Sequence, residues 1–169
     1  MTRYTAVIST LLFSLTVVAI TPISPEKVCA RLSTASANIL CLKTIRGSID
    51  KIDPNACGIC DNLSIDETKI QCMSLLAAAP EVRYIPVALD VCARISTDLA
   101  SIECLKTIQL GRYFDDRATK ICDVLSLDTT KIDCMKTIRD RHFDLESLRI
   151  CSVLASDSKI ITCLREARY

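Results

Sequence analysis

The residues of this chain most able to do chemistry are its 11 cysteines. Ten of them form five pairs, and the two members of each pair stand 12 positions apart. The pairs are Cys29 and Cys41, Cys60 and Cys72, Cys92 and Cys104, Cys122 and Cys134, and Cys151 and Cys163. The first members follow one another at intervals of 31, 32, 30 and 29 residues. A nearly fixed period of this size indicates stacked supersecondary units with one cysteine pair in each.

The other reactive residues do not form a metal site or a catalytic set. Zinc sites bring together Cys or His ligands that are often about two to four residues apart in sequence, but this chain has one histidine, His142, and one CxxC sequence. His142 stands beside Arg141 and Phe143 in an expected turn, without a legible nucleophile or orienting acid. We therefore expect no catalytic residue, no metal and no cofactor, and we interpret His142 as a surface residue.

Cys57 is the cysteine left over, and it forms the CxxC sequence with Cys60. Such a pair can be redox-active where a helix N-terminus lowers the pKa of its first thiol. The sequence Asp53-Pro54 places Cys57 near a helix start, but Cys60 already has Cys72 as its partner. We interpret Cys57 first as an inert buried thiol. The alternatives are an intermolecular disulfide that makes a homodimer, and thiol exchange.

Residues 1–19 have the pattern of a signal peptide. Arg3 is their only charge, and the small residues Val17 and Ala19 fit the −3 and −1 positions of a cleavage site. The alternative is an uncleaved membrane anchor, because Tyr4–Pro25 carries no charge. Export to a secreted or periplasmic location favours disulfides over metal ligands or free thiols. After cleavage we expect no stable membrane insertion.

Charge balance excludes a class of partners. Without Arg3, 20 basic and 20 acidic residues remain, so the formal net charge is zero. A neutral chain has no general electrostatic attraction to nucleic acid or to an anionic membrane.

The residues around each cysteine follow a helical pattern. Apolar residues stand at −1, 0 and +3 from the first cysteine of each pair, and at −2, +1 and nearly always +4 from the second. One continuous helix cannot carry both cysteines, because 12 residues rise about 18 Å whereas the Cα atoms of a disulfide lie about 4.4–6.8 Å apart. The chain must therefore turn back between them, which predicts an αα-hairpin in each repeat.

Small polar residues mark the expected bends. The midpoints of the five pairs are Ala35, Asp66, Asp98, Asp128 and Asp157, and Ser33, Ser64, Ser96 and Ser126 stand two residues before the first four. Because Ser and Asp side chains accept hydrogen bonds from free N–H groups, we expect them to cap the start of each second helix. Ser64 and Glu67 also have the spacing of a capping box.

The expected starts of the first helices carry two further signals. Asp53, Asp115 and Asp144 are predicted N-caps, the first of them followed by proline at a favourable position. Larger apolar residues lie eight positions before the first cysteine, namely Ile52, Tyr84, Phe114 and Phe143. We interpret these as packing between repeats, with an exposed ligand-stacking row as the alternative.

These observations predict an all-α fold, a stack of five disulfide-stapled αα-hairpins in a right-handed α-solenoid or compact helical array. Residues 20–169 form one repeat domain with hairpins at about 22–47, 53–78, 86–110, 115–139 and 144–168. A longer period of about 62 residues is also visible, since VCARLSTASANILCLKTIR resembles VCARISTDLASIECLKTIQ. The first four hairpins thus read as a two-hairpin block that was duplicated once.

The second helices carry a row of basic residues. Lys43, Lys106, Lys136 and Arg165 stand at +2 from the second cysteine, and Arg46, Arg139 and Arg168 at +5. Cations late in a helix complement its negative C-terminal end, and this is the first interpretation. If stacking aligns them, the row is a possible binding face for an acidic partner or a glycan.

The cysteine pair in each helical hairpin resembles the secreted, tetratricopeptide-like cysteine-rich repeat proteins of bacteria, in which each helix pair is crosslinked. The resemblance covers Val28 to Arg168 in plan; those proteins have a shorter cysteine spacing and a somewhat longer period. It implies an exported interaction scaffold and carries over no functional residue.

The leading hypothesis is therefore an exported scaffold, not an enzyme, that binds a protein or glycan through its turns or its second helices. One alternative is a thiol-active or disulfide-linked dimeric protein acting through Cys57. Another is a secreted inhibitor or toxin whose specificity lies in the loops Arg46–Asn55 and Leu110–Asp116.

Overall fold

The computed structural model of the protein describes residues 20–167. The predicted signal peptide at residues 1–19 lies outside the described residues, and so does Arg168 of the basic row. Over residues 20–167, no helix combines the length and the apolar character needed to cross a bilayer.

The described chain folds into five helical hairpins, which confirms the predicted all-α array. Repeat 1 contains α1 (Pro25–Ala30) and α2 (Ala35–Ile45), repeat 2 contains α3 (Pro54–Asn62) and α4 (Asp66–Ala78), repeat 3 contains α5 (Pro86–Ala93) and α6 (Asp98–Gln109), repeat 4 contains α7 (Asp116–Asp123) and α8 (Asp128–Ile138), and repeat 5 contains α9 (Leu145–Ser152) and α10 (Asp157–Glu166). A short 3₁₀ helix, η1 (Ile49–Lys51), lies between repeats 1 and 2.

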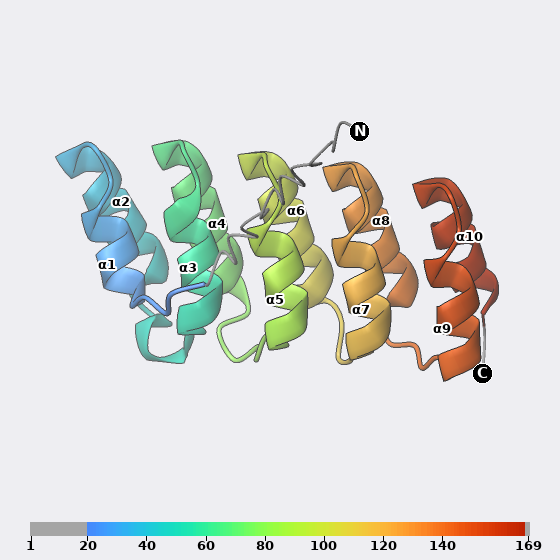
Figure 1. Ribbon diagram of the computed structural model, residues 1–169. Coiled ribbons are helices and arrows are strands. Elements are labelled where there is room, and N and C mark those ends of the chain that lie inside the picture. Colours follow the sequence, from blue (N-terminus) through green and yellow to red (C-terminus); the bar gives the residue numbers. More distant parts are fainter. Residues whose placement is uncertain (1–19, 168–169) are drawn as a thin grey trace, which may run out of the picture.

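The five hairpins stand side by side in one row, with the first helices in one layer and the second helices in another (Figure 1). The bends within hairpins lie along one edge of the row, which we call the bend edge. The connections between repeats lie along the opposite edge, which we call the loop edge (Figure 1). Repeats 1 and 5 therefore each leave one flank without a neighbouring repeat among the described residues.

Each hairpin is closed by the disulfide that the sequence predicts. All five pairs of cysteines that are 12 residues apart are joined, and their Cα atoms lie 5.4–5.5 Å apart. Nine of these ten cysteines are fully buried, and Cys163 of repeat 5 is partly exposed. The staples thus lie inside the two-layer core, where they hold together helices too short to be stable alone.

The first helices begin where the sequence predicts. The Asp53 carboxylate accepts a hydrogen bond from the Asn55 amide at 2.8 Å. Asp115 and Asp144 cap α7 and α9 in the same way. These caps satisfy N–H groups at the loop edge that have no partner within the helix.

Apolar residues of successive repeats make one continuous core. Ile52, Tyr84 and Phe114 are buried and Phe143 is partly buried against the core, which confirms the interpretation as packing between repeats. Burying a side chain of this size stabilises the fold by roughly 1.5–3 kcal/mol. The array therefore gains stability from contacts that no single hairpin can make.

The bends differ from the prediction. Asp66, Asp98, Asp128 and Asp157 are the first residues of the second helices, and the residue before each one is the N-cap. Their carboxylates do not cap their own helices but accept hydrogen bonds from the serine of the preceding repeat. The predicted capping box of Ser64 and Glu67 is wrong for the same reason, because the Ser64 hydroxyl donates to Asp98.

Four such contacts form what we call the Ser–Asp ladder. Ser33 with Asp66, Ser64 with Asp98, Ser96 with Asp128 and Ser126 with Asp157 each pair through both the serine amide and the serine hydroxyl, at 2.6–3.0 Å. Every junction between neighbouring repeats therefore contains one rung of the ladder. The rungs run along the bend edge and fix the position of each bend against the next.

A second polar contact alternates along the row. Arg31 pairs with Asp61 between repeats 1 and 2, and Arg94 pairs with Asp123 between repeats 3 and 4. At the other two junctions a threonine of α4 or α8 donates to the ladder aspartate instead, Thr68 to Asp98 at 2.6 Å and Thr130 to Asp157 at 2.8 Å. The alternation has the period of two hairpins that the sequence similarity indicates.

Candidate functional site

The bend edge carries a series of large aliphatic side chains that face solvent. They are Ile65 of repeat 2, Leu99 of repeat 3, Val124 and Leu127 of repeat 4, and Val153 of repeat 5. Each is more than half exposed, and Val124 and Val153 reach 78%. Single exposed apolar residues need no explanation, but a series along one edge of four consecutive repeats makes this edge the candidate interaction surface.

The local backbone explains why these side chains are exposed. Val124 and Val153 occupy the turn that ends a first helix, and Ile65 and Leu127 are the N-caps of α4 and α8. An N-cap position favours Ser, Thr, Asp or Asn over aliphatic residues, which lack a side-chain acceptor. Isoleucine and leucine are thus present at the bends despite the local preference of the backbone.

The Ser–Asp ladder holds these bends in place electrostatically. Hydrogen bonds from Ser33 lower the pKa of Asp66 below its usual value. Those from the hydroxyls of Ser126 and Thr130 lower the pKa of Asp157. At Asp98 partial burial acts to raise the pKa, but the hydrogen bonds from Thr68 and Ser64 outweigh it, and the pKa is lowered. Asp66, Asp98 and Asp157 are therefore charged at neutral pH, and their hydrogen bonds tie each bend to its neighbour.

The predicted basic row is less coherent than its sequence spacing indicates. Lys43, Lys106, Lys136 and Arg165 are exposed on successive second helices except α4, where Ser74 interrupts the row. Acidic residues lie among them: the Lys136 ammonium is 3.0 Å from a Glu103 carboxylate oxygen, and exposed Asp133 stands on the same helix. The described part of this face therefore has mixed charge. Arg46 and Arg139, at the ends of their helices, fit the helix-dipole interpretation.

The leftover thiol is buried and protonated. Cys57 is fully buried in α3, and burial, with a contribution from the Asp53 charge, raises its pKa to about 12. Redox and nucleophilic cysteines have lowered pKa values and partial exposure. The geometry matches the inert thiol and gives the dimer and thiol-exchange hypotheses no support.

A chain segment that the sequence analysis did not place covers the helix of Cys57. The Ile23 amide donates to the Pro54 carbonyl at 3.1 Å. A Cβ atom at Gly58 would lie 2.7 Å from the Thr21 carbonyl oxygen. Gly58 is therefore the residue that lets this segment approach α3, and the corresponding positions in the other repeats carry charged residues. A glycine at a position that is charged in the other repeats was therefore the sequence signal that could have predicted this close approach.

The loop edge holds the remaining predicted residues. His142 is exposed and lies against the ring of Tyr113, with ring centroids 4.3 Å apart. The Asp140 carboxylate accepts hydrogen bonds from the amides of Arg112 and Tyr113 at 2.7 and 3.1 Å, and Asp140 has a φ of 58°. The loop Leu110–Asp116 is thus fixed by its neighbour. Over residues 20–167, no cluster of His, Cys, Asp and Glu that could hold a metal ion occurs.

The fold and its staples define the class: a disulfide-stapled helical repeat protein built from αα-hairpins. The chain matches no protein-family model, no curated protein and no solved structure. The five disulfides fit an oxidising compartment.

Proposed function

We propose that the protein is an exported scaffold, secreted or periplasmic, that binds another protein along its bend edge. The observation that carries the proposal is the series of exposed aliphatic side chains on the bends of four consecutive repeats. When a partner removes such side chains from water, the complex is stabilised by about 25 cal/mol per Å² of apolar surface buried. The Ser–Asp ladder lowers the entropic cost of binding, because the bends are ordered before the partner arrives.

Three features support a binding protein over an enzyme and a protein partner over a glycan. Cys57 lies in α3 of repeat 2 and has a raised pKa, whereas His142 lies in the connection between repeats 4 and 5, so these candidates for nucleophilic and acid–base chemistry do not share a site. The second-helix face, which a glycan or acidic partner would need, has mixed charge. The bend edge offers aliphatic groups instead, which suit an apolar protein surface.

The test compares leucines on the two edges. A photo-crosslinking amino acid is placed at Leu99 or Leu127 on the bend edge and at Leu110 or Leu145 on the loop edge, all four of which are exposed. Each variant is expressed in the source cells, and the exported protein is irradiated in the compartment that it reaches. We expect a discrete adduct from the bend-edge positions and none from the loop-edge positions.

A set of polar variants then measures the contribution of the edge. For this measurement the crosslinker is placed at Val124, a further exposed position of the bend edge. The triple change Ile65→Ser, Leu99→Ser, Leu127→Ser is expected to remove its adduct, whereas Leu110→Ser with Leu145→Ser is expected to leave it. Equal adducts from both edges, or adducts from the loop edge alone, would instead favour the inhibitor-like alternative with loop-borne specificity. No adduct at any of the four positions would contradict the proposal.

A further inference from the structure

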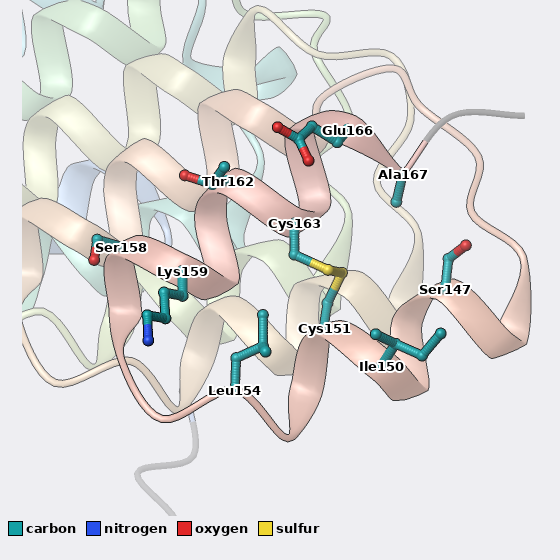
Figure 2. Close-up of a pocket in the computed structure, with 10 residues that line it drawn as sticks. All are labelled: Ser147, Ile150, Cys151, Leu154, Ser158, Lys159, Thr162, Cys163, Glu166 and Ala167. Carbon is teal, nitrogen blue, oxygen red and sulfur yellow. A yellow bond between two sulfur atoms is a disulfide. The ribbon is translucent and has the colours of Figure 1, made fainter.

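The flank of repeat 5 carries an open apolar groove of about 520 Å³. Its lining includes Ile150 and Leu154 from the first half of this hairpin and Cys163 and Ala167 from the second half. The Cys151–Cys163 disulfide lies between the two halves (Figure 2). The same positions in repeats 1–4 are buried by the next repeat: Ile150 is 54% exposed, whereas its counterpart Val91 is 1% exposed. The groove is therefore one half of a junction between repeats.

The flank of repeat 1 is the other half of such a junction. Ile39 is 54% exposed and Leu42 36%. Their counterparts in repeat 3, Ile102 and Leu105, are 8% and 0% exposed because repeat 2 covers them. The two ends of the row therefore present opposite, complementary sides of the same interface.

The polar contacts of the junctions are missing at both ends. The ladder aspartate is replaced by Ala35 in repeat 1, and the ladder serine is replaced by Ala155 in repeat 5. The Arg–Asp pair, which two of the four internal junctions carry, is absent here too, since Val153 stands at the arginine position of repeat 5 and Ala30 at the aspartate position of repeat 1. Terminal repeats of soluble arrays normally have a polar outer face, whereas each of these substitutions removes a polar group.

We propose that the flank of repeat 5 binds the flank of repeat 1 of a second copy, so that molecules join head to tail. The contact continues the established interface between repeats, with Ile39 and Leu42 entering the groove beside Ile150 and Leu154. Ala35 then faces Ala155, and Ala30 faces Val153, so these four positions bring no unpaired charge to the contact; the exposed residues Lys159 and Glu166 also line the groove. The two flanks lie at opposite ends of the row (Figure 1). A heterologous contact of this kind extends into a chain of copies unless its rotation closes a ring.

The first experiment blocks one flank at a time. Ile39→Asp blocks the flank of repeat 1, and Ile150→Asp blocks the flank of repeat 5; both side chains are exposed, so the hairpins still fold. In sedimentation velocity, we expect the oxidised wild type to grow beyond a dimer as concentration rises and each variant to be monomeric. An equimolar mixture of the two variants is expected to form a dimer and nothing larger, since each supplies one intact flank.

The second experiment adds the missing rung between copies. Ala35→Asp alone is expected to weaken association, because it brings an unpaired carboxylate to the contact, and Ala155→Ser alone is expected to leave it unchanged. Together they place a serine opposite an aspartate, as at every internal junction, and are expected to tighten association about tenfold relative to Ala35→Asp alone, as one charge-assisted hydrogen bond would.

Three results would overturn the proposal. They are a wild type that stays monomeric at all concentrations, a self-associating Ile39→Asp or Ile150→Asp variant, and no coupling between the changes at positions 35 and 155. The bend-edge triple variant serves as the control and is expected to associate as the wild type does. Failure of the bend edge to bind a partner and failure of the flanks to self-associate are thus measured separately.

Discussion

The inside of a hairpin and the junction between two hairpins are held in different ways. Inside, a disulfide joins the two helices covalently across 5.4–5.5 Å between Cα atoms. Between hairpins, apolar side chains pack and one Ser–Asp rung closes the polar edge. A covalent bond therefore holds each hairpin together, whereas packing and hydrogen bonds hold the hairpins to one another. The hairpins and the junctions between them should therefore come apart under different conditions.

Reduction of the disulfides should have the largest effect on stability. Closing a loop of about a dozen residues is worth about 3 kcal/mol by loop-closure reasoning, and five such loops rival the net stability of an ordinary domain. We expect the reduced protein to lose much of its helical signal in far-UV circular dichroism and to melt far below the oxidised protein. A Cys57→Ser protein reduced in parallel is the control, and unchanged spectra and melting points would contradict a role for the staples.

Removing a side chain from a junction should have the next largest effect. Leu105→Ala should lower the free energy of unfolding by about 2–5 kcal/mol, since Leu105 is fully buried between repeats 2 and 3. Leu42→Ala, at the same position of repeat 1, is the matched control and should cost less than about 1 kcal/mol, because Leu42 is partly exposed. Similar losses for the two variants in urea unfolding would contradict the covering of Leu105 by its neighbour.

Breaking a rung of the Ser–Asp ladder should have a smaller effect. Asp98 accepts hydrogen bonds from the Ser64 amide and hydroxyl, the Ile65 amide and the Thr68 hydroxyl. Because the site is largely exposed, Asp98→Ala should cost on the order of 1 kcal/mol in urea unfolding. Asp50→Ala, an exposed aspartate outside the ladder, should change stability little.

Acid should weaken the junctions through the same residues. Hydrogen bonds lower the pKa of Asp66 and Asp157 in the folded state, so their contribution to stability is present above the ordinary carboxyl pKa of about 3.9. It is lost as the pH falls through the lowered values. Melting temperature followed from pH 6 to pH 2 should fall less in a protein carrying Asp66→Asn and Asp157→Asn than in the wild type. An equal fall in both would contradict this assignment.

The smallest expected effect concerns Cys57, whose thiol should not react with an alkylating reagent in the native protein. A raised pKa and full burial should keep the native protein unlabelled by iodoacetamide at pH 8, while the unfolded, unreduced protein takes up one label. Labelling of the native protein, read by intact mass, would reopen the thiol-active and dimeric alternatives.

The cysteines predicted the hairpins because geometry leaves one solution. Two positions joined by a disulfide cannot lie 12 residues apart on one helix, and the helical spacing around each cysteine leaves only the bend undetermined. The N-caps at Asp53, Asp115 and Asp144 were equally accessible, because a cap and the helix that it starts are neighbours in sequence.

The Ser–Asp ladder could not be assigned in the same way. An aspartate that caps its own helix and one that binds the preceding bend occupy the same position in sequence, and only stacking separates them. The available signal lay at the ends of the array, where Ala35 replaces the aspartate and Ala155 replaces the serine. The exposed aliphatic residues at Ile65 and Leu127 were missed because apolar residues were assigned to the core by their spacing, and the bend has no such periodicity.

The position of the staples also determines how the protein would respond to force. Each disulfide closes its loop around the bend, so the 12 residues from one cysteine to the next cannot be drawn out. At about 3.4 Å per extended residue, each loop withholds roughly 35 Å of contour length. A molecule pulled from its two ends would therefore lengthen in short steps as neighbouring hairpins separate. It would stop well before full extension, because the five crosslinked loops stay closed as long as their disulfides are intact.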